Sequence, residues 1–498
     1  MEDKSVIIIG AGIAGLAAGY YAQTNGFKVT IFEMHDKSGG LCTCWKRKDY
    51  KIEGCVHILI GTKEGMLYND IWNELGVIQN VNFGYSDVYY SIETLSKKVV
   101  NIYTDLDKLE SHLKDISKED SKLIEEIINF IKTIRNLNIP VEKEPSLAKL
   151  SDKIKNFINV IPFALQLQKW NSISLENLSK KFKSDVLKEA FPLLWYPEMP
   201  ALFIFFMLGW LNVKNGGYPI SGSEQIAKAM EKKFREVGGE IKLKSSVEKI
   251  IVEDNQAVGV KLKNGEIHKS DYVISACDGK TTFEKFLDNK FQSKFWKTFY
   301  EEQKPSSTVV KLVLGIKEKI ETPEKSYLGT NIVLDPPVLI AGEKIKRMSV
   351  YINNFDKTMM PDNSTMIEVT LISDYTRWNE LSKDQNLYNE EKEKVKKIVL
   401  EILEKKYPNI SSKIEMLDIS TPVTIQRYSH NYNGAIQGWH PNPKTMGLYL
   451  PKQLPTLKNF FMCGHWTESL GGVPIAAVTG KNIIRLICKK EKINFKNK

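Results

Sequence analysis

The N-terminal segment is the feature that most constrains the fold of this chain. An apolar run at residues 6–9 leads into a turn that contains Gly10, Gly12 and Gly15. A helix-compatible stretch and a second apolar run follow, and the second run ends at Glu33, 18 positions after Gly15. This order is typical of a βαβ unit that binds a dinucleotide, in which an acid about 20 residues after the glycines binds a ribose. The segment therefore predicts a nucleotide site. The alternative is a glycine-rich turn without a ligand.

Each position of this motif has a physical reason. Gly10 allows a tight turn, Gly12 lets the backbone approach a pyrophosphate, and Gly15 lets the helix pack closely on the strand. Ala14 lies in the first helical turn, where free N–H groups face an anion. Glu33 is then placed to accept hydrogen bonds from the ribose hydroxyls.

Composition excludes several classes of partner. The 498 residues correspond to about three domains. The net charge of +10 is spread along the chain without a compact basic stripe, which argues against nucleic acid as a partner. The lysines are scattered among glutamates, so we expect most of them to form a solvated face, with weak attraction to anionic lipid as the alternative. Six cysteines do not form a disulfide framework, and Cys42 and Cys44 have no second Cys/His pair at zinc-site spacing, so we expect no metal.

The ends and the apolar runs of the chain predict its location. The first strand begins close to the N-terminus, which leaves no room for a signal peptide in this sequence. The longest apolar run, residues 199–211, is shorter than the roughly 20 residues that a membrane span needs. We therefore expect a cytoplasmic protein, with attachment to a membrane surface as the alternative.

Further candidate cofactor contacts lie far from the first motif. Gly39, Gly40 and Leu41 follow Glu33 closely, and the two glycines let another loop approach a phosphate. The strand-like run that contains Val247 is spaced so that its backbone can pair with an adenine edge. Near the C-terminus, a strand-like run ends at Gly464, and Gly472 and Val473 begin a helix-compatible run. A glycine pair that opens a helix is a second N-terminus able to face negative charge, as on a reduced flavin ring.

Taken together, these motifs resemble those of FAD-dependent phytoene desaturases, carotenoid isomerases and retinol saturases. The resemblance is strong at both ends and in residues 215–280, and weaker in 85–190 and 285–415. In the segment 50–57 the saturase pattern has an aspartate and a glycine, where this chain has Glu53 and Cys55. His57 matches the saturase-like branch, whereas phytoene desaturases usually carry proline and threonine there. Lys37 and Leu41 flank Gly39 and Gly40, where many relatives have arginine.

The resemblance implies an α/β fold with a discontinuous, Rossmann-like FAD-binding domain, a mixed-sheet substrate domain and a helical insertion. We expect the FAD-binding domain at residues 1–84, 215–290 and 421–498. The helical insertion is expected at 85–214 and the rest of the substrate domain at 291–420. The residue patterns themselves predict helices between about 100 and 190, a helix at 224–237, strands at 308–314, 348–352 and 366–372, and a charged helix at about 383–406.

The activity implied is an FAD-dependent oxidoreductase that desaturates, saturates or isomerises carbon–carbon double bonds. Its substrate would be apolar, isoprenoid-like or fatty, and reached from a membrane surface. The candidates for moving a proton are His57, because imidazole titrates near neutral pH, and then His465 and Glu468. A structural role is the alternative for each of them. Two other functions remain open on the same fold: a flavin amine oxidase and a prenyl or lipid carrier without catalysis.

Overall fold

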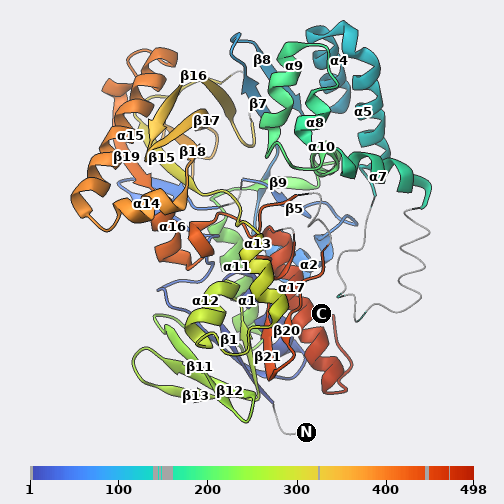
Figure 1. The fold of residues 1–498 in the computed structure, drawn as a ribbon, viewed down its shortest axis with the longest axis vertical. Coiled ribbons are helices and arrows are strands. Elements are labelled where there is room, and N and C mark those ends of the chain that lie inside the picture. The colour runs from blue at the N-terminus through green and yellow to red at the C-terminus, as the bar shows by residue number, and fades with distance from the viewer. Residues whose placement is uncertain are drawn as a thin grey trace.

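The computed structural model describes residues 4–55, 57–137, 144, 147, 161–322, 326–442, 448–469 and 471–497. Figure 1 shows three parts: a lobe that contains both marked chain ends, a sheet with helices at the upper left, and a group of helices at the upper right.

The first sheet gathers strands from three distant parts of the chain. Parallel strands stand in the order β10-β2-β1-β14-β21, and β12 and β11 continue the sheet beyond β21. Two short strands, β13 and β20, pair with β12 and β21. The bounds are β1 Ser5–Ile9, β2 Lys28–Phe32, β10 Glu240–Lys242, β11 Val247–Glu253, β12 Gln256–Leu262, β13 Ile267–Lys269, β14 Tyr272–Ser275, β20 Gln453–Leu454 and β21 Leu457–Met462.

The central strand β1 shows why the sequence forms this sheet. Ile8 is fully buried and pairs with Ile31 of β2 on one side and Ile274 of β14 on the other. A parallel sheet that is covered on both faces needs such continuous β-branched apolar strands. The sheet therefore fixes residues near 8, 31 and 274 side by side.

Helices from both ends of the chain cover this sheet. Helix α1, Ile13–Thr24, packs against α17, Val473–Lys490, and against α11, Glu224–Glu236. The predicted helix at 224–237 is thereby confirmed. Four shorter helices belong to the same lobe: α2 Asn69–Glu74, α3 Val77–Asn80, α12 Gly279–Thr281 and α13 Lys294–Glu302.

The second sheet has the order β19-β15-β18-β17-β16-β7-β8 and is antiparallel except between β16 and β7. The strands predicted at 308–314, 348–352 and 366–372 and the helix predicted at about 383–406 are confirmed. The bounds are β7 Val88–Glu93, β8 Val99–Tyr103, β15 Val309–Ile316, β16 Thr330–Ile340, β17 Glu343–Asn353, β18 Thr365–Ile372, β19 Ile414–Ser420, α14 Tyr375–Leu381, α15 Gln385–Lys406 and α16 Pro422–Ser429.

The group of helices at the upper right of Figure 1 confirms the helices predicted between about 100 and 190. The start of that range instead belongs to strand β8, and much of 138–160 lies outside the described residues. The helices of this group are α4 Leu106–Ile116, α5 Ser121–Ile134, α7 Ala164–Ser172, α8 Leu175–Ser179, α9 Asp185–Ala190 and α10 Ala201–Asn212. The apolar run at 199–211 forms α10, and among the described residues no helix is long and apolar enough to cross a membrane. Two further small sheets are formed by β3 Cys44–Arg47 with β4 Tyr50–Glu53, and by β5 Leu59–Ile60, β9 Gly216–Pro219 and β6 Phe83–Gly84.

Candidate cofactor site and its neighbours

The glycine-rich turn after β1 has the tight geometry that its sequence predicts. Gly10 has a φ of +98° and donates its N–H to the Phe32 carbonyl at 2.8 Å. A Cβ on Gly15 would lie 2.0 Å from the Gly10 carbonyl oxygen. Both positions therefore require glycine, because one has a left-handed φ and the other touches backbone.

The start of α1 offers room and hydrogen-bond donors for an anion. Gly12 is the N-cap of α1, and no side chain caps the helix there. A Cβ on Gly12 would meet no atom within 4 Å. The second glycine loop lies alongside, since Gly39 donates its N–H to the Ala11 carbonyl at 2.9 Å and a Cβ on Gly40 would lie 3.4 Å from the Gly12 Cα. An uncapped helix N-terminus beside open space is the arrangement that binds phosphate groups.

Glu33 ties the second strand to this turn. Its carboxylate is 6% exposed and accepts hydrogen bonds from the Ala11 N–H at 2.8 Å and the His35 N–H at 3.0 Å. Its carbonyl accepts from the Ser245 N–H at 2.7 Å, two residues before Val247. Val247 is itself buried and begins β11. The structure thus brings the predicted ribose-binding acid and the predicted adenine-edge segment to the same place.

The C-terminal segment meets the first helix directly. A Cβ on Gly464, just after β21, would lie 3.7 Å from the Ala14 Cβ, and a Cβ on Gly480 would lie 2.5 Å from the Ala14 carbonyl oxygen. Helix α17 begins at Val473 after its N-cap Gly472, again without a side-chain cap. Two uncapped helix N-termini from opposite ends of the chain therefore belong to one packed unit.

His57 lies where the loop after β4 meets the second sheet. Its Nδ1 lies 3.3 Å from the Tyr327 carbonyl oxygen, and its Nε2 lies 3.6 Å from a Glu368 carboxylate oxygen. The ring centroids of His57 and Tyr351 are 4.4 Å apart. The predicted proton-transfer residue is therefore buried beside charged and aromatic side chains of the second sheet.

Sequence analysis does not single out the charged residue that contacts His57, Glu368, or its ion-pair partner Lys311. Glu368 on β18 forms an ion pair of 2.8 Å with Lys311 on β15, and both side chains are largely buried. Lys311 also donates to the Glu53 carbonyl at 2.8 Å. The signal in the sequence is that each charge interrupts an otherwise apolar strand.

The other two residues predicted for proton transfer, His465 and Glu468, have surroundings different from those of His57. Burial lowers the pKa of His465 to about 4, so its imidazole is neutral at pH 7. Glu468 forms an ion pair of 2.9 Å with the buried Lys452, and burial raises the pKa of the Glu468 carboxyl. Within the described residues, no hydrogen bond, ion pair or ring contact joins either residue to His57.

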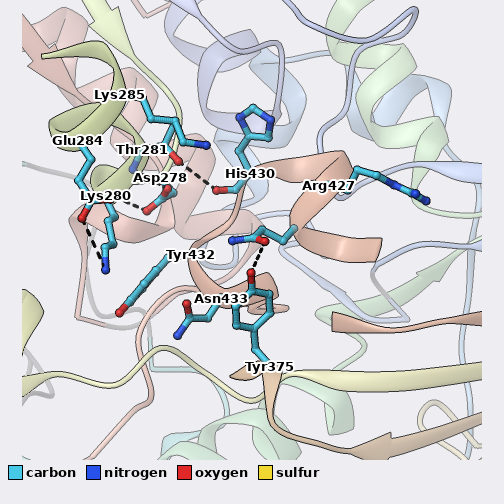
Figure 2. A pocket seen from close by; sticks show the side chains of 11 residues that line it. Asp278, Lys280, Thr281, Glu284, Lys285, Tyr375, Arg427, His430, Tyr432 and Asn433 are labelled. Carbon is cyan, nitrogen blue, oxygen red and sulfur yellow. Dashed lines mark hydrogen bonds and ion pairs between the residues drawn. The ribbon is translucent and has the colours of Figure 1, made fainter. Parts of the chain in front are cut away.

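A polar cavity of about 410 Å³ lies where α12 and the residues after it face α14 and α16 (Figure 2). Thr281 donates to the His430 carbonyl at 3.3 Å across it, and Lys280 lies 3.6 Å from Glu284. Burial and the nearby Lys285 lower the pKa of His430. None of the residues predicted for the cofactor or for catalysis lines this cavity.

Comparison with known proteins identifies the family. The sequence pattern of the flavin-containing amine oxidoreductases matches residues 13–486. The chain belongs to this family. The match includes α1 at one end and most of α17 at the other.

Proteins similar in sequence to this chain include a desaturase and an isomerase. The 4,4'-diapophytoene desaturase (4,4'-diapolycopene-forming) of Methylomonas sp is 24% identical over 527 residues, which covers 100% of this chain and 97% of that protein. The chloroplastic prolycopene isomerase of Daucus carota is 24% identical over 444 residues, which covers 86% of this chain and 70% of that protein.

A solved structure of putrescine oxidase, bound to putrescine, has the same fold. It covers 98% of this chain and 99% of that chain with a TM-score of 0.59 and 13% identity. The predicted α/β fold with a Rossmann-like FAD-binding domain is confirmed, and the protein is an FAD-dependent oxidoreductase. The open space at Gly12 and the two uncapped helix N-termini fit this cofactor.

Proposed function

We propose that this chain transfers hydride between FAD and a carbon–carbon bond of an apolar isoprenoid-like or fatty substrate. The observation that carries the proposal is the match to the carotenoid desaturase over the whole chain. The match to the carotenoid isomerase supports the same class of substrate. Such substrates partition into lipid, so we expect the enzyme to meet them at a membrane surface.

The proposed cofactor contacts follow from the packed unit formed by both chain ends. Gly10, Gly12, Ala14 and Gly15 would place the N–H groups of α1 against the pyrophosphate. Gly39, Gly40 and Leu41 would close the other side, Glu33 would bind the ribose and Val247 would pair with the adenine edge. Gly464, Gly472 and Val473 would place the N-terminus of α17 near the flavin ring, where it favours negative charge.

FAD supplies the hydride acceptor or donor when it is bound. What the protein must provide is a dry cavity and a group that takes up one proton for each hydride removed, or gives one for each hydride added. Desaturation removes a hydride and a proton from neighbouring carbons, and saturation adds both. We assign the proton to the His57 imidazole, because it is a buried proton-transfer group that faces the second sheet rather than bulk water.

The decisive experiment is anaerobic mixing of the purified holoenzyme with candidate substrates while the flavin absorption is followed. Loss of the flavin absorption when 4,4'-diapophytoene is added indicates desaturation. Return of the flavin absorption when a polyene is added to the pre-reduced enzyme indicates saturation. A change in double-bond geometry of prolycopene without net bleaching indicates isomerisation.

Two outcomes would contradict the proposal. Bleaching by putrescine or aromatic amines, with no response to polyenes, would favour a flavin amine oxidase. A purified protein that holds no flavin, even after incubation with FAD, would favour a prenyl or lipid carrier.

A further inference from the structure

Three neighbouring strands of the second sheet place Tyr351, Glu368 and Lys311 on one face. Tyr351 of β17 pairs directly across from Glu368 of β18. Lys311 of β15 pairs with Thr370, two positions from Glu368, so their side chains point to the same side of the sheet. The ring contact of Tyr351 with His57 shows that this face meets the loop after β4.

The charged pair on this face is not explained by stability. The residues two positions along the same strands, Val313 and Met366, lie on the same face and belong to an apolar cluster. Burying an ion pair costs desolvation of both charges, and a well-packed apolar replacement is often as stable or more stable. The contact of Glu368 with His57 gives the pair a candidate functional role instead.

The cluster restrains the ring of His57 from both edges. The Tyr327 carbonyl oxygen lies 3.3 Å from Nδ1, and a Glu368 carboxylate oxygen lies 3.6 Å from Nε2. Glu368 is in turn held by Lys311, which is anchored to the Glu53 carbonyl. The Glu53 carboxylate accepts hydrogen bonds from Ser223 and from the N–H of Cys55, two residues before His57.

A second observation points to a bound molecule at this place. The Tyr351 side chain is 5% exposed, and its hydroxyl has no hydrogen-bond partner within the part of the chain that the structure describes. Buried polar groups in folded proteins nearly always have a partner, so the exceptions call for an explanation. A water molecule bound beside the His57 ring, or a polar group of a bound substrate, would supply that partner.

We propose that Glu368 is a positioning residue, which fixes the His57 imidazole beside Tyr351 so that it exchanges a proton with the bound substrate. This inference rests on the proposed function, in which His57 carries the proton. Lys311 acts as the counter-ion that keeps the carboxylate in place.

The test compares Glu368→Gln and Glu368→Asp with the control Glu343→Gln. Glu343 lies on the same sheet and accepts hydrogen bonds from Ser373 and the Asp374 N–H, away from His57. For the polyene that the holoenzyme accepts, stopped-flow absorption gives the rate constant of the flavin change and the half-saturating concentration. We expect Glu368→Gln to lower the rate constant about 10- to 100-fold, because general acid–base catalysis depends on placement.

The half-saturating concentration should stay within about threefold, since the proton moves only in the transition state. Glu368→Asp should recover part of the rate, because it keeps the charge. A raised half-saturating concentration with an unchanged rate constant, or an equal loss in Glu343→Gln, would overturn the positioning role.

Crystal structures of the FAD-loaded variants give a readout that needs no substrate. In Glu368→Gln the His57 ring should lose its contact with the Tyr327 carbonyl, and in Glu343→Gln it should keep it. If the single variant does not fold, Lys311→Met with Glu368→Gln removes both charges together and allows the same comparison. A ring that stays in place overturns the inference, whatever substrate the enzyme uses. A ring that moves in an enzyme inert toward polyenes supports the positioning role and contradicts the proposed function.

Discussion

Gly480 of α17 packs against Ala14 of α1 so closely that a Cβ on Gly480 would lie 2.5 Å from the Ala14 carbonyl oxygen. The contact joins positions near the two ends of the chain, in the helices whose uncapped N-termini we assign to FAD. Backbone atoms cannot move aside as a flexible side chain can. The close approach therefore sets how the two helix starts sit relative to each other.

Gly480→Ala should reduce stability by about 1–3 kcal/mol, because an added methyl must push α1 and α17 apart. We expect a lower Tm and easier loss of FAD, measured by calorimetry and by flavin retained after gel filtration. The matched control is Gly19→Ala in α1, where the nearest atom is the end of the Ile31 side chain, at 2.8 Å. Equal effects of the two substitutions would contradict the importance of the backbone contact.

Glu33→Gln should weaken FAD binding about tenfold or more, because hydrogen bonds to a charged group contribute about 1.5–3 kcal/mol each. The amide also presents an N–H where the carboxylate now accepts from Ala11 and His35. Fluorescence titration of the apoprotein with FAD measures the affinity. Glu240→Gln, at an exposed glutamate of β10, should bind as the parent does. Undiminished affinity in Glu33→Gln would exclude the ribose role.

His57→Gln should slow the flavin change with substrate about 10²- to 10⁴-fold while FAD content stays the same. The physical reason is that glutamine fills similar space but cannot exchange a proton. Stopped-flow absorption and the flavin-to-protein ratio are the measurements. Parallel loss of flavin and rate would show that His57 holds the structure or the cofactor instead.

The burial of His465 should make the free energy of unfolding depend on pH. Its folded-state pKa of about 4 lies below the ordinary value of 6.5, so the unfolded chain binds the proton more tightly. The free energy of unfolding should therefore fall as the pH drops from about 6.5 toward 4, and this contribution should level off below that. Measured by denaturant titration, His465→Gln should show a weaker decrease over this range than the parent. An identical pH dependence in both proteins would contradict the buried, neutral imidazole.

Local sequence predicted the first βαβ unit because each of its constraints is local. Gly10 needs a left-handed φ, Gly15 touches the turn five residues before it, and the apolar runs alternate with a helix. The same reasoning predicted strands of the second sheet and helix α15, because the hydrophobic pattern of a segment is visible in its own sequence whichever strands it pairs with.

Only the tertiary structure decided which distant residues meet. Sequence analysis placed His57 first, because imidazole titrates near neutral pH, and His465 and Glu468 second. In the structure, burial leaves His465 neutral and Lys452 pairs with Glu468. Sequence analysis did not predict Glu368 and Lys311 as site residues, because each is a single charge within an apolar strand. They come together with His57 because β15 and β18 are neighbours in a sheet whose order does not follow the chain. Periodicity fixes which face of a strand is buried, but pairing between strands fixes what that face touches.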